Sequence, residues 1–262
     1  MELPFYQRIE SVFCMNCPSL PPIEAILFDL DGTLLNVEMD AYISGYVRGL
    51  ARHFSDLANR CRFADTVVAT AFDLLKADCG EQTMEELFLD LLQERLGINA
   101  ELFRDRLNQY CDNGLHRLAP LVRPFPLARK ILQYCFDSGL RVIIATNPVF
   151  PLPVVEARLK WGQLDDFPFE LITSYENSRY CKPHRQYFMD ILYSQDLTPQ
   201  QTIMVGNDTE YDLPAQRAGL TTFLLDTCLI DRQNRLAHAD FCGSHQDLLE
   251  LVRCIVANRR NN

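Results

Sequence analysis

The sequence predicts an α/β fold, a three-layer Rossmann-like core around a parallel sheet, with an all-helical domain inserted in it. Residues 25–30 form a short apolar run without a helical period, typical of a strand buried on both faces. Residues 38–114 instead carry apolar side chains at three- and four-residue intervals. After Pro120 short apolar runs alternate with amphipathic stretches, which favours parallel strands joined by helices.

Each expected element follows from one of these patterns. The helical block contains four amphipathic stretches, with glycines near the breaks at 80, 97 and 114, where a helix end favours a left-handed residue. In the alternating part we expect strands at 141–145, 169–172, 202–205 and 221–225. The helices expected there cover 127–136, 154–161, 184–193, 213–218 and 248–256.

The helical block separates the first strand from the rest of its sheet. An insertion explains this order better than two domains in series. We therefore expect an N-terminal extension at 1–22, an α/β core made of 23–36 and 118–262, and an inserted domain at 37–117. The two attachment points, near residues 36 and 118, should be adjacent.

Composition excludes several classes of protein. The 262 residues carry a net charge of −10, whereas a nucleic-acid-binding protein is expected to present an excess of basic residues. No apolar run reaches the length of a membrane span, and the first residues do not resemble a signal peptide. The 10 cysteines are scattered, and Cys14 and Cys17 have no second pair at a zinc-ribbon distance. We expect reduced thiols in a cytoplasmic protein, either a monomer or a homodimer.

Two carboxylates end the first strand. In open α/β sheets ligands bind at the carboxyl ends of the strands, and here the chain reads Asp29-Leu30-Asp31-Gly32-Thr33. Because strand side chains alternate, Asp29 and Asp31 point to the same side, about 7 Å apart along the chain. Such a pair repels unless a cation lies between the two groups or one is protonated. On its own, a plain strand-end turn would explain this segment equally well.

Further polar groups follow the other strands. Thr146 and Asn147 end one strand and offer a hydroxyl and backbone N–H groups to an anion. Lys182, followed by Pro183, precedes an expected helix, and its ammonium group could bind a phosphate or simply be solvated. Asp208 and Asp212 follow another strand, four residues apart in what we expect to be the first turn of a helix, where a capping role is also ordinary. All these groups fall at one edge of one expected sheet, which favours a common site.

This set, in this order, resembles the haloacid dehalogenase-like hydrolase superfamily over about residues 23–256. The resemblance is carried by Asp29-Leu30-Asp31-Gly32-Thr33, by Thr146, by Lys182-Pro183, and by Asp208 with Asp212. The helical insertion after the first motif is similar to the superfamily's first type of cap domain, which opens and closes over the active site. An acid at Asp31 favours phosphatases over dehalogenases, which lack it.

The resemblance implies a role for each motif. Asp29 would be the nucleophile that forms an aspartyl-phosphate, and Asp31 the general acid and base. Thr146 and Lys182, with Gly32 and Asn147, would bind the phosphoryl oxygens. Mg²⁺ would be the cofactor, held by Asp29, the Asp31 carbonyl and Asp208, with Asp212 in support.

Other positions are less defined. Asn207 stands where many relatives have glycine, which leaves open whether Asn207 or Asp208 reaches the metal; a carboxylate is the better ligand, which favours Asp208. Tyr42 and Tyr46 could touch substrate, although both fit an apolar helical stripe and favour core packing. Arg123 could bind a second anionic group or simply be solvated.

The expected function is Mg²⁺-dependent hydrolysis of a small phosphorylated metabolite, a phosphomonoester, by a phosphatase. One alternative is a phosphosugar mutase that uses the same intermediate. The other is a non-catalytic binding protein that retains the fold. No nucleic acid or membrane is expected as a partner.

Overall fold

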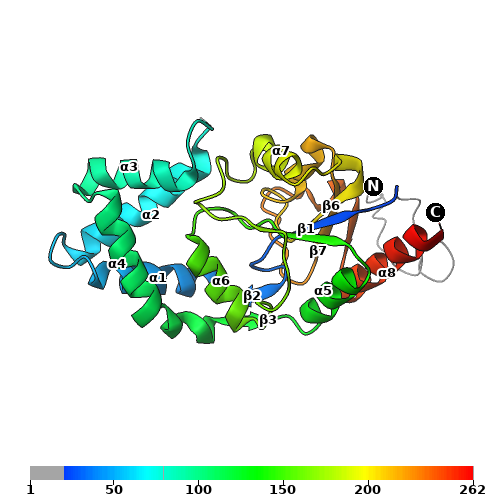
Figure 1. Ribbon diagram of the computed structural model, residues 1–262, viewed down its shortest axis with the longest axis horizontal. Coiled ribbons are helices and arrows are strands. Elements are labelled where there is room, and N and C mark those ends of the chain that lie inside the picture. The colour runs from blue at the N-terminus through cyan, green and yellow to red at the C-terminus, as the bar shows by residue number, and fades with distance from the viewer. Residues whose placement is uncertain (1–20, 79, 262) are drawn as a thin grey trace.

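A six-stranded parallel sheet forms the centre of the computed structural model, which describes residues 21–78 and 80–261 (Figure 1). The strand order is β5-β4-β1-β6-β7-β8. The strands are β1 (Ala25–Phe28), β4 (Arg141–Ile144), β5 (Leu171–Ile172), β6 (Thr202–Gly206), β7 (Thr221–Leu225) and β8 (Phe241–Gly243). The expected α/β core is confirmed, with β1 between β4 and β6 in parallel register.

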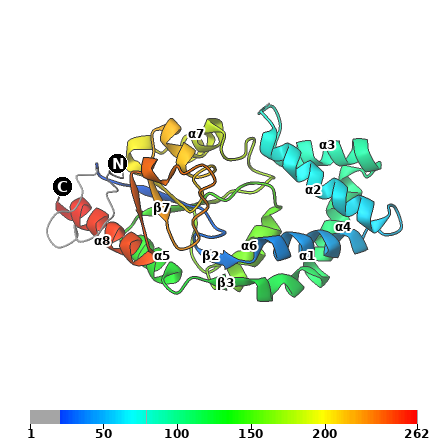
Figure 2. The same ribbon diagram turned by 180° about the vertical axis from the view of Figure 1, so that it is seen from behind.

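Helices cover both faces of the sheet. They are α5 (Ala128–Asp137), α6 (Leu152–Trp161), α7 (Arg185–Ser194) and α8 (His245–Asn261). Alternate β1 residues enter two separate cores: Ile26 and Phe28 pack in the cluster that includes α5 and α8, whereas Ala25 and Leu27 pack in the cluster that includes α7. Figure 2 shows α7 on the opposite side of the strands from α5 and α8. Burial on both faces explains why β1 is a continuous apolar run.

A second group of helices lies at the other end of the molecule (Figures 1 and 2). It consists of α1 (Met39–Arg52), α2 (Arg60–Lys76), α3 (Met84–Leu96) and α4 (Ala100–Asn113). The Thr83 and Glu86 side chains form a capping box at the start of α3, and the Phe54 ring stacks on that of Phe63 at 4.5 Å. We call α1 to α4 the cap helices.

Two short antiparallel strands join the cap helices to the core. They are β2 (Leu35–Val37) and β3 (Val122–Pro124), and Asn36 pairs with Arg123. The 3₁₀ helix η2 (Leu115–Leu121) leads into β3. The chain therefore leaves and re-enters the core at neighbouring points. The exact domain boundaries given above stay a prediction.

The structure differs from expectation in a few elements. The segment expected to be a helix at 213–218 is the 3₁₀ helix η4 (Leu213–Ala218), and Pro214 cannot donate a backbone hydrogen bond there. The last helix begins at His245, earlier than expected, and β2, β3 and β8 were not expected. Two more 3₁₀ helices are η3 (Pro199–Gln201) and η5 (Leu236–His238).

The cysteines also differ in part from expectation. Cys61, Cys111, Cys135, Cys181 and Cys228 are free thiols. Cys254 is disulfide-bonded, so the expectation of reduced thiols is wrong at this residue. The expected N-terminal extension, up to residue 20, and with it Cys14 and Cys17, lie outside the described residues. Among residues 21–78 and 80–261, none of the helices combines the length and apolarity that a membrane span requires.

Candidate active site

The polar groups that follow β1, β4 and β6 meet in one cavity of about 380 Å³ between the sheet and the cap helices. We call this space the catalytic cavity. Its lining includes every site residue expected from the sequence: Asp29, Asp31, Gly32, Thr146, Asn147, Lys182, Asp208 and Asp212. Parallel strands explain the convergence, because their carboxyl ends lie at one edge of the sheet.

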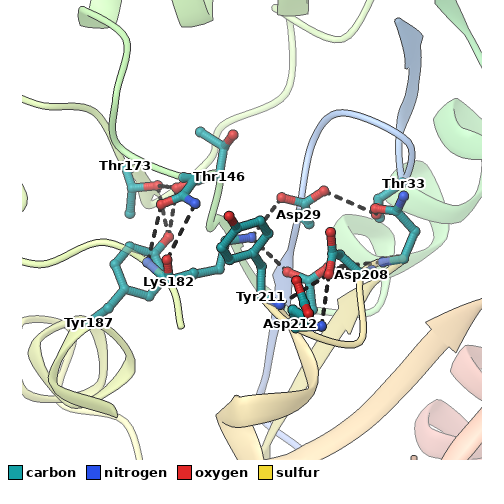
Figure 3. A network of polar contacts seen from close by, with 12 residues as sticks. Asp29, Thr33, Thr146, Thr173, Lys182, Tyr187, Asp208, Tyr211 and Asp212 are labelled. Carbon is teal, nitrogen blue, oxygen red and sulfur yellow. Dashed lines mark hydrogen bonds and ion pairs between the residues drawn. The ribbon is translucent and has the colours of Figure 1, made fainter. Parts of the chain in front are cut away.

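Lys182 is the centre of the polar network (Figure 3). Its Nζ donates to Asp29 Oδ1 and to Asp212 Oδ1, both at 2.7 Å, and its side chain is only 2% exposed. Burial alone would lower the pKa of Lys182, but the Asp212 and Asp29 carboxylates outweigh burial and raise it. Lys182 is therefore a permanent cation between two carboxylates.

Asp29 is the most perturbed carboxyl group of the site. Burial, with smaller contributions from the charges of Asp212 and Asp31, raises its pKa to about 7, although the Lys182 ammonium opposes this shift. Its second oxygen, Oδ2, accepts from Thr33 Oγ1 at 3.3 Å. A buried carboxylate with one oxygen held by a lysine is oriented to act as a nucleophile.

Asp31 pairs with a residue that the sequence did not single out. Arg158 on α6 is fully buried and forms an ion pair with Asp31 Oδ2. Its guanidinium lies 4.8 Å from the centre of the Phe150 ring. Asp31 Oδ1 is buried and has no hydrogen-bond partner among the described residues. Because Asp31 Oδ1 has no partner among those residues, it could exchange a proton with a molecule bound in the cavity.

Hydrogen bonds within the site hold Asp212 and Asn207 in place. Asp212 Oδ2 accepts from the backbone N–H groups of Asn207 and Asp208, both at 3.0 Å, so both of its oxygens are engaged. The Asn207 amide accepts from Thr33 Oγ1 at 3.2 Å and donates to Cys228 O at 2.7 Å. Asn207 thus links the β1 loop to the segment after β7.

Asp208 lies in a turn after β6, not in the first turn of a helix as expected. Its Oδ1 accepts from the Glu210 and Tyr211 N–H groups at 2.8 and 3.2 Å, and Arg232 donates to its Oδ2 at 3.0 Å. Burial raises the pKa of Asp208. Arg232 also lines the cavity and was missed by the sequence reasoning.

Backbone and side-chain contacts hold the phosphate-binding candidates. The Thr146 carbonyl accepts from Thr173 Oγ1 at 2.7 Å and from Tyr187 Oη at 2.8 Å (Figure 3). Asn147 Oδ1 accepts from the Lys182 backbone N–H at 3.1 Å. Thr173 and Tyr187 were not expected from the sequence, because a buried threonine or tyrosine is an ordinary core residue.

Gly32 lets the β1 loop approach Asn207. Its φ is +86°, and an added Cβ would lie 2.3 Å from Asn207 Nδ2. Of the less defined candidates, Tyr42 is fully buried, Tyr46 is 6% exposed, and Arg123 is exposed on β3. Tyr42 and Tyr46 each pack against Phe150, with ring centres 6.0 and 5.4 Å apart.

The carboxylates suit a hard cation. Among the described residues no three or more His, Cys, Asp or Glu side chains form a ready metal-binding group. Mg²⁺, however, commonly uses only one or two protein carboxylates and completes its octahedron with water. Asp29 and Asp208 line one cavity and could provide them. The four aspartates of the cavity outnumber the three basic side chains that pair with them in the described part of the chain, which favours a bound cation.

Comparison with known proteins relates the chain to hydrolases. Residues 23–219 match a family model described as haloacid dehalogenase-like hydrolase. The chain is 24% identical over 210 residues to a pyrophosphatase PpaX of Bacillus mycoides, covering 80% of this chain and 86% of the relative. A pyrophosphatase PpaX of Bacillus cereus is 25% identical over 200 residues, covering 76% and 82%.

Solved structures share the fold. A predicted phosphoglycolate phosphatase from Haemophilus somnus superposes with a TM-score of 0.54 at 18% identity, covering 88% of this chain and 98% of that one. A putative β-phosphoglucomutase from Thermotoga maritima also gives a TM-score of 0.54, at 19% identity, covering 88% and 99%.

Proposed function

Because this chain belongs to the haloacid dehalogenase-like hydrolases and is a phosphatase-type enzyme, we propose that it hydrolyses a small phosphomonoester through an aspartyl-phosphate at Asp29, with Mg²⁺ as cofactor. One observation carries the proposal. Lys182 Nζ lies 2.7 Å from oxygens of both Asp29 and Asp212 in a buried cavity. This arrangement positions a nucleophile and places a fixed positive charge where phosphoryl oxygens would bind.

The first step transfers the phosphoryl group to the protein. An Asp29 carboxylate oxygen attacks phosphorus, and the bond from phosphorus to the alcohol oxygen breaks. Asp31 enters this step protonated at Oδ1 and gives that proton to the alcohol oxygen, while Arg158 donates to Oδ2. Lys182 and the backbone around Thr146 hold the phosphoryl oxygens.

The second step returns Asp29 to its starting state. Asp31, now a carboxylate, takes a proton from a water molecule, which attacks phosphorus. The bond between phosphorus and Asp29 breaks, and inorganic phosphate leaves. Mg²⁺, held by Asp29, Asp208 and the Asp31 carbonyl, would supply charge neutralisation for the phosphoryl group.

Phosphate release from p-nitrophenyl phosphate, with and without Mg²⁺, tests the proposal. We expect release that depends on Mg²⁺, stops with EDTA and is absent in Asp29→Asn. Product analysis separates hydrolysis from the mutase reaction, because a mutase returns phosphate to the sugar and releases none. A protein that releases no phosphate from a broad panel of phosphorylated metabolites would not be a phosphatase.

A further inference from the structure

A second cavity, of about 540 Å³, adjoins the catalytic cavity. It lies between the cap helices and the loop after β4. Four residues line both cavities: Ile43 on α1, Leu75 on α2, and Val149 and Phe150 in the loop. The two spaces therefore meet at these side chains, and we call the larger one the cap chamber.

The cap chamber is mainly apolar. Val47, Val67, Ala71, Phe88 and Phe103 contribute to its wall. Among the described residues that line it, none is a lysine, arginine or histidine.

The polar lining groups of the cap chamber bring no positive charge. They are Asp40, Ser44, Tyr46 and Tyr175. Both tyrosines are buried, and burial raises the pKa of each phenol, so both stay neutral. The chamber can thus accept an apolar group, with a few neutral hydrogen-bonding groups at its wall.

Anionic leaving groups do not suit this space. A negative group there would lose water without gaining a cation, and would lie near the Asp40 carboxylate. Three neighbouring arginines, Arg48, Arg52 and Arg117, line a different hollow, which shares no lining residue with the cap chamber or the catalytic cavity.

Arg232 is a cation that lines the catalytic cavity, but it is already paired. Its Nη1 lies 3.0 Å from Asp208 Oδ2 and 3.1 Å from Glu210 Oε2. Arg232 does not line the cap chamber, so it offers no cation to a group bound there.

We infer that the leaving group of the substrate is an uncharged, mainly apolar alcohol that occupies the cap chamber. This inference rests on the proposed function and adds the substrate class: phosphomonoesters of aliphatic or aromatic alcohols. A volume of about 540 Å³ is typical of sites that enclose a small organic molecule. Pyrophosphate and phosphoglycolate, substrates that the names of related proteins suggest, are poor substrates on this reasoning.

The test is a series of phosphomonoesters of increasing chain length. Phosphate release is measured with Mg²⁺ for methyl, butyl and hexyl phosphate, and for pyrophosphate and phosphoglycolate. We expect kcat/KM to rise with each added methylene, by about fourfold where the methylene is fully buried. Hexyl phosphate should exceed both anionic compounds.

A pair of variants on α2 locates the effect. Ala71→Phe fills the cap chamber and should remove the rise between butyl and hexyl phosphate. Ala69→Phe places the same ring on the exposed side of α2 and should keep the rise.

Each outcome decides the inference. A flat series in the wild-type protein, or a preference for pyrophosphate or phosphoglycolate, overturns the inference and leaves the proposed function standing. The same rise in Ala71→Phe as in Ala69→Phe also overturns it. Absence of phosphate release from all five compounds overturns the inference where p-nitrophenyl phosphate or another member of the broad panel is hydrolysed, and overturns the proposed function itself where none is. The wild-type series gives an answer even where a variant does not fold.

Discussion

Replacing Lys182 with methionine removes one positive charge from the middle of the site and changes little else in side-chain shape. The side chain of Lys182 is 2% exposed, and those of its partners Asp29 and Asp212 are 11% and 1% exposed. The variant therefore leaves two carboxylates facing each other in a buried cavity. Removing one partner of a buried ion pair costs about 3–5 kcal/mol of folding free energy. The phosphoryl oxygens also lose their nearest cation.

We expect Lys182→Met to lower the free energy of unfolding by about 3–5 kcal/mol and to abolish phosphate release. Urea unfolding followed by the fluorescence of Trp161, the 1 tryptophan of the chain, measures stability in the core. Lys160→Met is the matched control, because Lys160 is exposed at the end of α6; its effect should stay within about 0.5 kcal/mol.

The double variant Lys182→Met/Asp212→Asn separates charge from packing. It removes one of the two unpaired carboxylates and keeps an oxygen that can accept from the backbone after β6. We expect it to be more stable than Lys182→Met, although still inactive. A loss below about 1 kcal/mol in Lys182→Met, or activity like that of the wild type, would refute the buried-pair reasoning.

Three further predictions concern the surroundings of the site. Arg158→Met breaks the buried pair with Asp31 and should lower the free energy of unfolding by about 2–4 kcal/mol and kcat by tenfold or more. Arg129→Met, which breaks an exposed pair with Asp166, should change neither. Urea unfolding and phosphate release measure both quantities. Gly32→Ala forces a Cβ against a neighbouring side chain at φ +86° and should cost more stability and activity than Gly139→Ala, which meets open space at φ +69°; equal losses would contradict this. Burial lowers the pKa of His245, so its contribution to stability is present above about pH 6.5 and is lost as the pH falls. The thermal unfolding temperature should therefore fall less between pH 7 and pH 5 in His245→Asn than in the wild type. Equal falls in the two proteins would exclude His245 as the cause.

The sequence predicted the central strands well because they are buried on both faces. Runs such as 25–28 and 203–205 are apolar at every position, and this pattern is distinct from a helical stripe. The strands β2, β3 and β8 have 3 residues each, too few for a period to be visible. The local sequence pattern therefore predicted the central strands of the main sheet, but not β8 or the separate pair β2 and β3.

The candidate site was predictable where its residues follow strands. Asp29, Thr146 and Asp208 were expected at one edge of the sheet, and all three line one cavity. Arg158 was not expected, because a charged residue in a helix ordinarily faces solvent. Its partner Asp31 is 127 residues away, so only the fold brings the two together. The sequence does contain one signal for Arg158: it lies four residues after Val154, on the face of α6 that carries the apolar side chains.

The most direct test of the central claim is to trap the phosphorylated protein during turnover. Acid quenching preserves an acyl phosphate, and borohydride reduces it to an alcohol, which converts an aspartyl-phosphate to homoserine. The account predicts that peptide mass spectrometry finds homoserine at position 29 after incubation with substrate and Mg²⁺, and none in Asp29→Asn. Steady phosphate release with homoserine at another aspartate, or with Asp29→Asn still active, would contradict it.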